Sequence, residues 1–410
     1  MISRFIDLTY TRNAVRISMA LLMIVLLVFP SGVAFGATYT CSGTTPWHTS
    51  GATLPLPLET FGAAVFGTRM YIIGGYDNVD VTAPTLVYHK ALSAIATSSA
   101  STNWFSNSLW KDPNNPTEVV GLSRDLCGKT YTSPTTGNSY LYTVGGVYYD
   151  AATNNLDGDG KNHGLTTNQV WFTPLNSSNG NIGTWTSTSA LPVALQLHGS
   201  IVMTVGANTY IYVIGGSTSS DDVSPSTHVQ SHVYYAEISS ADGSVGSWTQ
   251  STHDIPTPGT GWYKTCPVAA NGRIYVSGGE DSASALDNVV YTTPSTTDGS
   301  PSAWTNNSSN YITIGGTLVT DAAQAVVLNG SNIELIAGDQ TGSGGNTNCV
   351  FQGAINASTG AVTWTTPSTI SPLTINVSRN TATSSGTNIF SLGGLTGSAG
   401  NDTNAIYYWP

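Results

Sequence analysis

The chain has 410 residues, of which 9% are charged, and its formal net charge at pH 7 is −11. A surface of this sign repels phosphate backbones and anionic lipid headgroups, which excludes nucleic acid and charged membrane surfaces as partners. Hydrophobic residues make up 40% of the sequence, and they occur in short alternating runs that predict strands rather than helices.

Residues 1–36 have the features of a secretory leader. Basic residues precede an apolar run at residues 20–29, and small residues follow it at Ala34 and Gly36. These features predict cleavage before Ala37 and a secreted, periplasmic or cell-surface location. The uncharged stretch from Ile17 to Ala37 is also long enough to span a bilayer, so an uncleaved anchor is the alternative. Beyond this segment we expect no contact with a membrane.

Three landmarks recur in a fixed order in residues 37–410. The first is an alternating apolar run that ends in two glycines, or once in Ala-Gly: Gly74-Gly75, Gly145-Gly146, Gly215-Gly216, Gly278-Gly279, Ala337-Gly338 and Gly393-Gly394. The second is an aromatic strand such as residues 233–238. The third is a tryptophan: Trp47, Trp104, Trp185, Trp248, Trp304 and Trp364. Each landmark has the period of a strand, and the turns between them carry the Gly, Asp and Ser of tight hairpins.

Four of the aromatic strands hold an aromatic residue thirteen positions before the tryptophan: Phe172, Tyr235, Tyr291 and Phe351. A fixed offset across a turn is expected when both side chains meet in one packed layer of a hairpin. The offset therefore predicts one strand register that is shared by successive units.

The order of the landmarks predicts how the repeats close. Units of about 55 to 70 residues with three or four short strands are typical of sheets repeated around an axis. The sixth aromatic strand, near Pro410, has no tryptophan strand after it, whereas residues 47–57 supply one before the first glycine pair. We therefore expect the N-terminal strand to complete the last sheet, which removes an exposed edge.

The double glycine, the aromatic strand and the later tryptophan together resemble the kelch repeat. The resemblance implies an all-β fold, a six-bladed kelch-type β-propeller that occupies residues 37–410 as one domain. It also implies a distant similarity to the bacterial N-acetylneuraminate epimerases (mutarotases) and to the propeller domain of galactose oxidase.

One face of such a propeller collects the loops that follow the glycine strands and the loops that lead into the innermost strands. The first set is rich in acids, including Asp221, Asp222, Glu280 and Asp281. The second set holds basic and aromatic residues that we expect around the channel mouth: Arg124, His198, Tyr263, Lys264 and Arg379. This combination predicts a small pocket for a carboxylate or a sugar. The alternative is that Arg124 and Arg379 pair with loop acids and fix neighbouring blades.

Two stretches of the sequence are candidate metal sites. Asp157 and Asp159 alternate as in a calcium loop, but Lys161 stands where a third ligand is expected and no bidentate Glu follows. Calcium is therefore a possible cofactor at this loop, and no other cofactor is expected. His228 and His232 lie near two acids in the sequence, with ordinary surface histidines as the alternative.

The four cysteines Cys41, Cys127, Cys266 and Cys349 allow two disulfides in an exported protein, with three possible connectivities. By the repeat, Cys349 corresponds to valines such as Val233, so it could instead be a small buried hydrophobe.

The sequence favours an exported binding module, without chemistry of its own, that recognises a glycan or an extracellular protein through the loop-rich face. A sugar-acid mutarotase is the alternative, and it would need a carboxylate or histidine within hydrogen-bond reach of the mouth arginines. Sialidases are also six-bladed, but Arg69 and Arg273 fall on the opposite face, which leaves too few arginines for a sialidase site. The copper ligands and flanking domains of galactose oxidase have no counterpart.

Overall fold

The computed structural model describes the following residues: 43–76, 85–97, 103–109, 121–123, 128–149, 165–219, 228–256, 261–264, 267–280, 289–307, 313–314, 317–318, 324–328, 330–340, 345–365, 370–396 and 401–410. They all belong to one compact unit, residues 37–410. The predicted leader lies outside the described residues. None of the helices described is long and apolar enough to cross a membrane.

The described residues form six four-stranded antiparallel sheets, which we number 1 to 6 and call blades. Blade 1 contains β2 (Gly62–Phe66), β3 (Arg69–Ile73), β4 (Leu86–Ala91) and β5 (Phe105–Ser108). Blade 2 contains β7 (Lys129–Thr132), β8 (Ser139–Val144), β11 (Val170–Leu175) and β12 (Thr186–Ser187). Blade 3 contains β13 (Gly199–Val205), β14 (Asn208–Ile214), β15 (Val233–Ile238) and β16 (Thr249–Gln250).

The remaining blades have the same plan. Blade 4 contains β17 (Val268–Ala270), β18 (Arg273–Ser277), β19 (Val289–Thr292) and β20 (Thr305–Asn306). Blade 5 contains β23 (Gln324–Leu328), β24 (Asn332–Gln340), β25 (Gly345–Ile355) and β26 (Val362–Thr365). Blade 6 contains β28 (Thr381–Ser385), β29 (Asn388–Leu392), β32 (Ile406–Trp409) and β1 (His48–Thr49).

Small elements lie in the loops within and between the blades. They are α2 (Leu92–Ile95), β6 (Gly121–Ser123), β9 (Val147–Tyr149), β10 (Leu165–Thr166), β21 (Thr313–Ile314), β22 (Thr317–Leu318), β27 (Val377–Ser378), β30 (Leu395–Thr396) and β31 (Asn401–Asp402).

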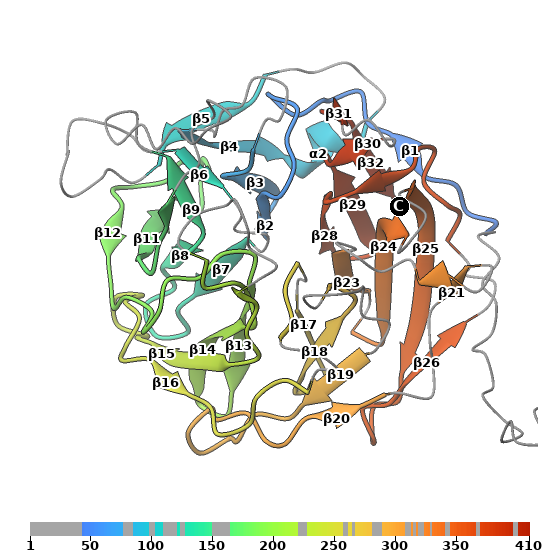
Figure 1. Ribbon diagram of the computed structural model, residues 1–410. Helices are drawn as coiled ribbons and strands as arrows, with labels where there is room; N and C mark the ends of the chain where they lie inside the picture. The colour runs from blue at the N-terminus through green and yellow to red at the C-terminus, as the bar shows by residue number, and fades with distance from the viewer. Residues whose placement is uncertain are drawn as a thin grey trace, which may run out of the picture. The chain divides into compact units, whose positions relative to one another are not determined.

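The innermost strands of the blades form a closed ring. Each of β2, β7, β13, β17, β23 and β28 contacts the next, and β28 contacts β2 again. Figure 1 shows the blades arranged around this centre. Antiparallel sheets repeated around an axis, with the first strand of each on the inside, define a β-propeller, as the sequence predicts.

The core lies between neighbouring blades because each second strand is apolar on both of its faces. In β14, Ile211 and Val213 pack against blade 2, whereas Tyr212 and Ile214 pack towards Ile274 and its neighbours in blade 4. Alternate residues of a strand point to opposite faces, so a sheet buried on both sides reads as a continuous apolar run.

The predicted closure is confirmed. β1 pairs with β32 in antiparallel register, with His48 opposite Tyr408, and so supplies the fourth strand of blade 6. The indole N–H of Trp47 donates to the carbonyl of Ser371 in the segment after blade 5, at 2.9 Å. Blade 6 is thus assembled from strands that are far apart in the sequence, and no tight turn joins β32 to β1.

The tryptophans repeat one link between blades. Four indole N–H groups donate to a backbone carbonyl of the preceding blade or of the segment after it: Trp104 to Thr53, Trp185 to Ser108, Trp248 to Ser189 and Trp304 to His253. These side chains are half-buried. The shared bond confirms equivalent positions for these four tryptophans, whereas the indole N–H of Trp364 in blade 5 has no hydrogen-bond partner.

Tyrosines of the second strands form another repeated link. The hydroxyl of Tyr71 donates to the carbonyl of Gly180 at 2.8 Å, that of Tyr142 to Gly243 at 2.6 Å, and that of Tyr212 to Gly299 at 2.7 Å. Each glycine lies in the turn between the third and fourth strands of the next blade. Burial raises the pKa of Tyr71 to about 12 and raises the pKa of Tyr142 and Tyr212 as well, so all three hydroxyls keep their protons.

The predicted register is wrong by one residue in blade 5. Tyr235 pairs with Tyr212 in blade 3, but the equivalent pair in blade 5 is Gln352 with Glu334 rather than one that includes Phe351. The hairpin between β25 and β26 explains the shift: Gln352 pairs with Thr365, thirteen residues on, whereas Tyr235 pairs with Thr249, fourteen residues on. A slip of one residue turns every side chain to the other face. Phe351 consequently packs on the blade 4 side.

The same slip changes the interpretation of Cys349. Its position does not correspond to Val233, and the residue is disulfide-bonded rather than a mere small hydrophobe. Its possible partners, Cys41, Cys127 and Cys266, all lie outside the described residues.

Candidate functional site

A cavity of about 350 Å³ lies within the ring of innermost strands. All six blades line it, with residues such as Ala64, Thr130, Ile201, Val268, Val326 and Thr383. Most lining side chains are small or apolar, so the cavity itself offers few groups that could hold a polar ligand. The polar residues are concentrated where the chain enters the innermost strands, at the mouth.

A repeated backbone conformation marks this mouth. Four non-glycine residues just before the innermost strands have left-handed φ angles: 52° at Thr60, 53° at Leu197, 58° at Lys264 and 52° at Arg379. Such a conformation is uncommon for non-glycine residues, and for a β-branched residue such as Thr60 it is strained. Left-handed residues at one repeat position indicate that the surrounding structure imposes this turn.

Hydrogen bonds between blades hold the turn. The N–H of Thr60 in blade 1 donates to the carbonyl of Arg379 in blade 6 at 3.2 Å. The N–H of Lys264 in blade 4 donates to the carbonyl of Leu197 in blade 3 at 2.9 Å. The backbone therefore fixes where the four side chains begin, whatever their identity.

Arg379 forms an ion pair across the junction of blades 6 and 1. Its Nη1 lies 3.1 Å from Oε2 of Glu59, a residue that the sequence analysis did not single out. The Arg379 side chain is 40% exposed, whereas that of Glu59 is 6% exposed. The pairing with an acid of the neighbouring blade is the alternative role that the sequence allowed for this arginine.

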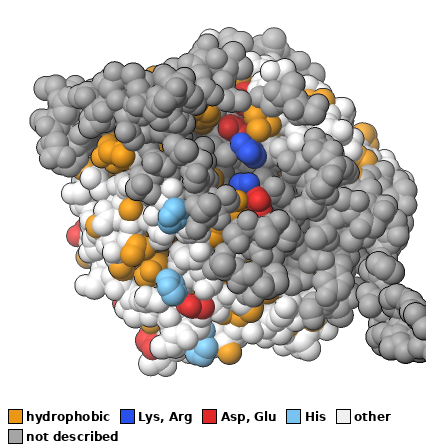
Figure 2. Space-filling model, viewed as in Figure 1, with side chains coloured by type: hydrophobic (Ala, Val, Ile, Leu, Met, Phe, Trp, Pro, Cys, Tyr) orange, Lys and Arg blue, Asp and Glu red, His pale blue; other side chains and the backbone are white. Residues whose placement is uncertain are grey.

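Lys264 and Glu280 form a second ion pair within blade 4. The Lys264 ammonium also lies 4.9 Å from the ring centroid of Tyr263, within the range of a cation–π contact. Tyr263 pairs with Glu280 through the backbone, which brings all three predicted residues together. Figure 2 shows basic side chains next to acidic ones near the middle of the face in view.

Other predicted residues lie elsewhere. His198 is fully buried, and its side chain packs beside Gly145 and Gly216 rather than reaching the surface. Tyr263 is also buried, in a cluster with Leu197 and Val229.

The remaining predicted site residues lie outside the described residues: Arg124, Asp157, Asp159, Asp221, Asp222 and Asp281. Ser123, directly before Arg124, pairs with Val147 just as Glu59 pairs with Tyr76 and Tyr263 with Glu280.

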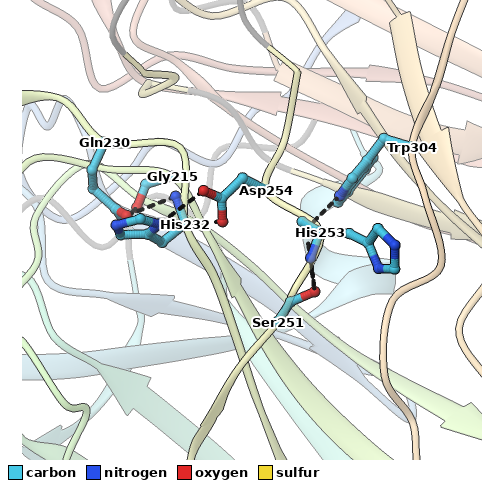
Figure 3. A network of polar contacts seen from close by, with 7 residues as sticks. All are labelled: Gly215, Gln230, His232, Ser251, His253, Asp254 and Trp304. Atoms are coloured by element: carbon cyan, nitrogen blue, oxygen red, sulfur yellow. Dashed lines mark hydrogen bonds and ion pairs between the residues drawn. The ribbon is translucent and has the colours of Figure 1, made fainter.

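The histidines considered for a metal have other contacts where they are described. His232 Nδ1 lies 3.1 and 3.2 Å from the two carboxylate oxygens of Asp254 (Figure 3). The backbone N–H of His232 donates to Oε1 of Gln230. The residues that the structure describes contain no group of three or more His, Cys, Asp or Glu side chains that could hold a metal ion. Asp254 was missed by the sequence analysis because it lies 22 residues from His232 with no motif between them.

Comparisons with known proteins support the fold. No model of a known protein family matches the chain, and no curated protein matches its sequence. Among solved structures, the chain is similar to one titled "Structure of YjhT", with a TM-score of 0.55 and 13% sequence identity, over 86% of this chain and 95% of that chain. At this identity the likeness concerns the fold alone, and it agrees with the class that the sheets define, a β-propeller.

Proposed function

We propose that this β-propeller is an exported binding protein that holds a hydroxyl-rich ligand bearing a carboxylate, such as an acidic glycan, at the mouth of its central cavity. The observation that carries the proposal is the placement of Lys264 and Arg379 at one repeat position, just before an innermost strand, each beside a carboxylate. A carboxylate and several hydroxyls are the groups that such a mixed set of donors and acceptors recognises.

The two ion pairs suit recognition of a sugar acid. A guanidinium has five N–H donors in a fixed fork, so pairing with Glu59 through Nη1 is compatible with binding a ligand carboxylate. The carboxylates of Glu59 and Glu280 accept hydrogen bonds from hydroxyl groups and discourage large polyanions. By its place after Ser123, Arg124 is proposed to add a third basic group to the same mouth.

Binding measurements on variants of the mouth test the proposal. A glycan-array screen of residues 37–410 identifies a ligand, and calorimetry with N-acetylneuraminic acid and its neutral counterpart N-acetylmannosamine tests the role of the carboxylate. Replacing both Lys264 and Arg379 with alanine should weaken binding of the acid by about 100-fold or more, because each lost charged hydrogen bond is worth about 1.5 kcal/mol or more.

Arg273→Ala is the matched control. This guanidinium lies on the opposite face and donates to the carbonyls of Ala357 and Ser358. Unchanged affinity in the double variant, or an equal loss in Arg273→Ala, would show that the ligand does not bind at the mouth.

A sugar-acid mutarotase is the second candidate, and one observation favours it. Glu59 provides a carboxylate within hydrogen-bond reach of Arg379, which is the arrangement that an acid/base group over a bound sugar acid requires. Proton NMR of freshly dissolved β-N-acetylneuraminic acid measures the rate of anomer exchange. A pure binding protein leaves that rate unchanged, whereas a mutarotase raises it and loses the effect in Glu59→Gln.

A further inference from the structure

The contact between blade 5 and blade 6 differs from the other blade contacts in its polar chemistry. In blades 2 and 3 the second strand presents a tyrosine to the next blade, and an aromatic residue of the third strand stands opposite it. Tyr142 pairs with Phe172, and Tyr212 pairs with Tyr235. Their ring centroids lie 6.0 and 6.1 Å apart. Each tyrosine hydroxyl then reaches a glycine carbonyl of the next blade, as described above.

Blade 5 replaces this aromatic pair with an acid and an amide. Glu334 pairs with Val326 and with Gln352, which places it at the repeat position of Tyr212. The residue is fully buried. Its Oε1 accepts a hydrogen bond from Nε2 of Gln352 at 2.9 Å, while Oε2 has no hydrogen-bond partner. A buried carboxyl with one unsatisfied oxygen is costly, and the cost rises steeply if the group is charged.

The next blade explains why a tyrosine is not needed here. The glycine carbonyls that accept the tyrosine hydroxyls lie in the turns between third and fourth strands. In blade 6 those strands are β32 and β1, which no turn joins. Glu334 therefore faces the one blade among the described six whose outer half consists of two separate chain segments.

The neighbouring strands offer little that could neutralise a charge. No lysine, arginine, aspartate or glutamate occurs in β23, β25, β28 or β29, and the only cysteine among them, Cys349, is in a disulfide. β32 contributes Tyr407 and Tyr408, and β1 contributes His48, whose ring stacks on Tyr408. The apolar side chains at this junction include Ile336, Ala382 and Ile389.

We propose that Glu334 makes the junction between blades 5 and 6 a pH-sensitive latch, closed while its carboxyl is protonated and weakened when the carboxyl ionises. The device concerns closure of the ring and is independent of any ligand at the mouth. Ionisation favours states in which water reaches the carboxylate, and the junction with the strand β1 is where the ring can part without breaking a turn.

Burial sets the direction of the effect. It raises the pKa of Glu334 to about 8, and the hydrogen bond from Gln352 opposes it. In an open state, where water reaches the carboxyl, the pKa of Glu334 returns to its ordinary value of about 4.3. The closed state is thus fully favoured at a pH below the ordinary value, and it loses stability as the pH rises towards 8.

Hydrogen exchange read by mass spectrometry on residues 37–410 tests the latch. The exchange rate of backbone N–H groups is first corrected for its intrinsic pH dependence. In peptides from β1, β28, β29 and β32, the corrected rate should be at least about tenfold higher at pH 8 than at pH 5. Peptides from β13, β14 and β15 of blade 3 are the internal control, and their opening should not follow this titration.

Two variants test whether ionisation of Glu334 itself opens blade 6. Glu334→Gln retains the shape and the hydrogen-bonding capacity but cannot ionise, so the pH-dependent opening of blade 6 should disappear. Tyr212→Phe weakens a blade contact without adding a titrating group, so it should raise exchange in blades 3 and 4 equally at both pH values. Opening of blade 6 that persists unchanged in Glu334→Gln, or that is spread evenly over all blades in the native chain, would overturn the proposal.

Discussion

The two ends of the blades use repeated positions in opposite ways. Where the third and fourth strands turn, the links between blades are neutral and chemically the same, as in the tyrosine hydroxyls that donate to Gly180 and Gly243. At the mouth the backbone is equally regular, with left-handed residues at one position, but the side chains differ: Thr60, Leu197, Lys264 and Arg379. Where both the backbone conformation and the side chain repeat from blade to blade, the position serves the scaffold. Where the backbone conformation repeats but the side chain varies, the position is free to serve recognition.

The charged pairs at the mouth fit this division. The Arg379 side chain is 40% exposed, but that of Glu59 is 6% exposed, and removing such charges from water offsets much of their attraction. The mouth pairs therefore contribute little net stability, whereas the tyrosine links are neutral. Substitutions should separate the two regions by their effect on the free energy of unfolding.

The largest loss is expected for Trp248→Ala. The indole packs in the cluster shared by blades 2 and 3 and donates to Ser189, so its removal should cost about 3 kcal/mol. Urea denaturation followed by circular dichroism measures the change. Phe105→Ala, at an aromatic residue that is 61% exposed, is the control and should cost less than about 0.5 kcal/mol. Equal losses would mean that the tryptophans do not carry the scaffold.

A smaller loss is expected for Tyr142→Phe. The change leaves the carbonyl of Gly243 without its buried donor and should cost about 1 to 2 kcal/mol. Tyr275→Phe is the matched control at the same repeat position, because the Tyr275 hydroxyl is buried without a hydrogen-bond partner. It should be neutral or slightly stabilising in the same denaturation experiment. A loss in Tyr275→Phe as large as that in Tyr142→Phe would show that ring packing, and not the hydroxyl link, is what matters.

The smallest effect is expected at the mouth itself. Thr60→Asn should stabilise the protein by about 0.5 kcal/mol, because asparagine adopts the left-handed region more readily than a β-branched residue. Thr186→Asn, in an exposed extended strand, should instead be slightly destabilising. Thermal unfolding of both variants gives the comparison. Destabilisation by Thr60→Asn would mean that the threonine side chain supports the mouth in a way that outweighs its strain.

The fold was predictable because its signals are local and repeated. A tryptophan marks every blade, a double glycine marks all of them except blade 5, and the unpaired tryptophan strand at Trp47 shows how blade 6 is completed. The register of blade 5 was not predictable from an offset, because its last hairpin is one residue shorter: Gln352 pairs with Thr365, thirteen residues on, whereas Tyr235 pairs with Thr249, fourteen residues on. Because this strand mixes apolar and polar residues, its hydrophobic pattern does not reveal a shift of one residue in register.

The mouth was predictable only as a location. The repeat places Lys264 and Arg379 there, but the partner of Arg379 is Glu59, which lies 320 residues away in sequence and outside the acid-rich loops. Burial of His198 was equally hidden, because its position next to Gly216 depends on packing between strands. One missed signal was available: a tyrosine before the glycine pair, as at Tyr71, Tyr142 and Tyr212, and an Asp-Gly or Asn-Gly turn in the next unit together predict the hydroxyl links.

Synthesis from the N-terminus imposes an order on closure of the ring. The first strand to be made, β1, has its partner in the last, and the indole N–H of Trp409 donates to the carbonyl of Thr45, 364 residues earlier. Blades 1 to 5 draw their four strands from continuous stretches of chain, so they can form as the chain lengthens, whereas blade 6 must wait for β32. Until then β1 has no sheet to join. Closure of the ring therefore depends on one pairing between strands that are very far apart in the sequence, and pairings of this kind are slow to form.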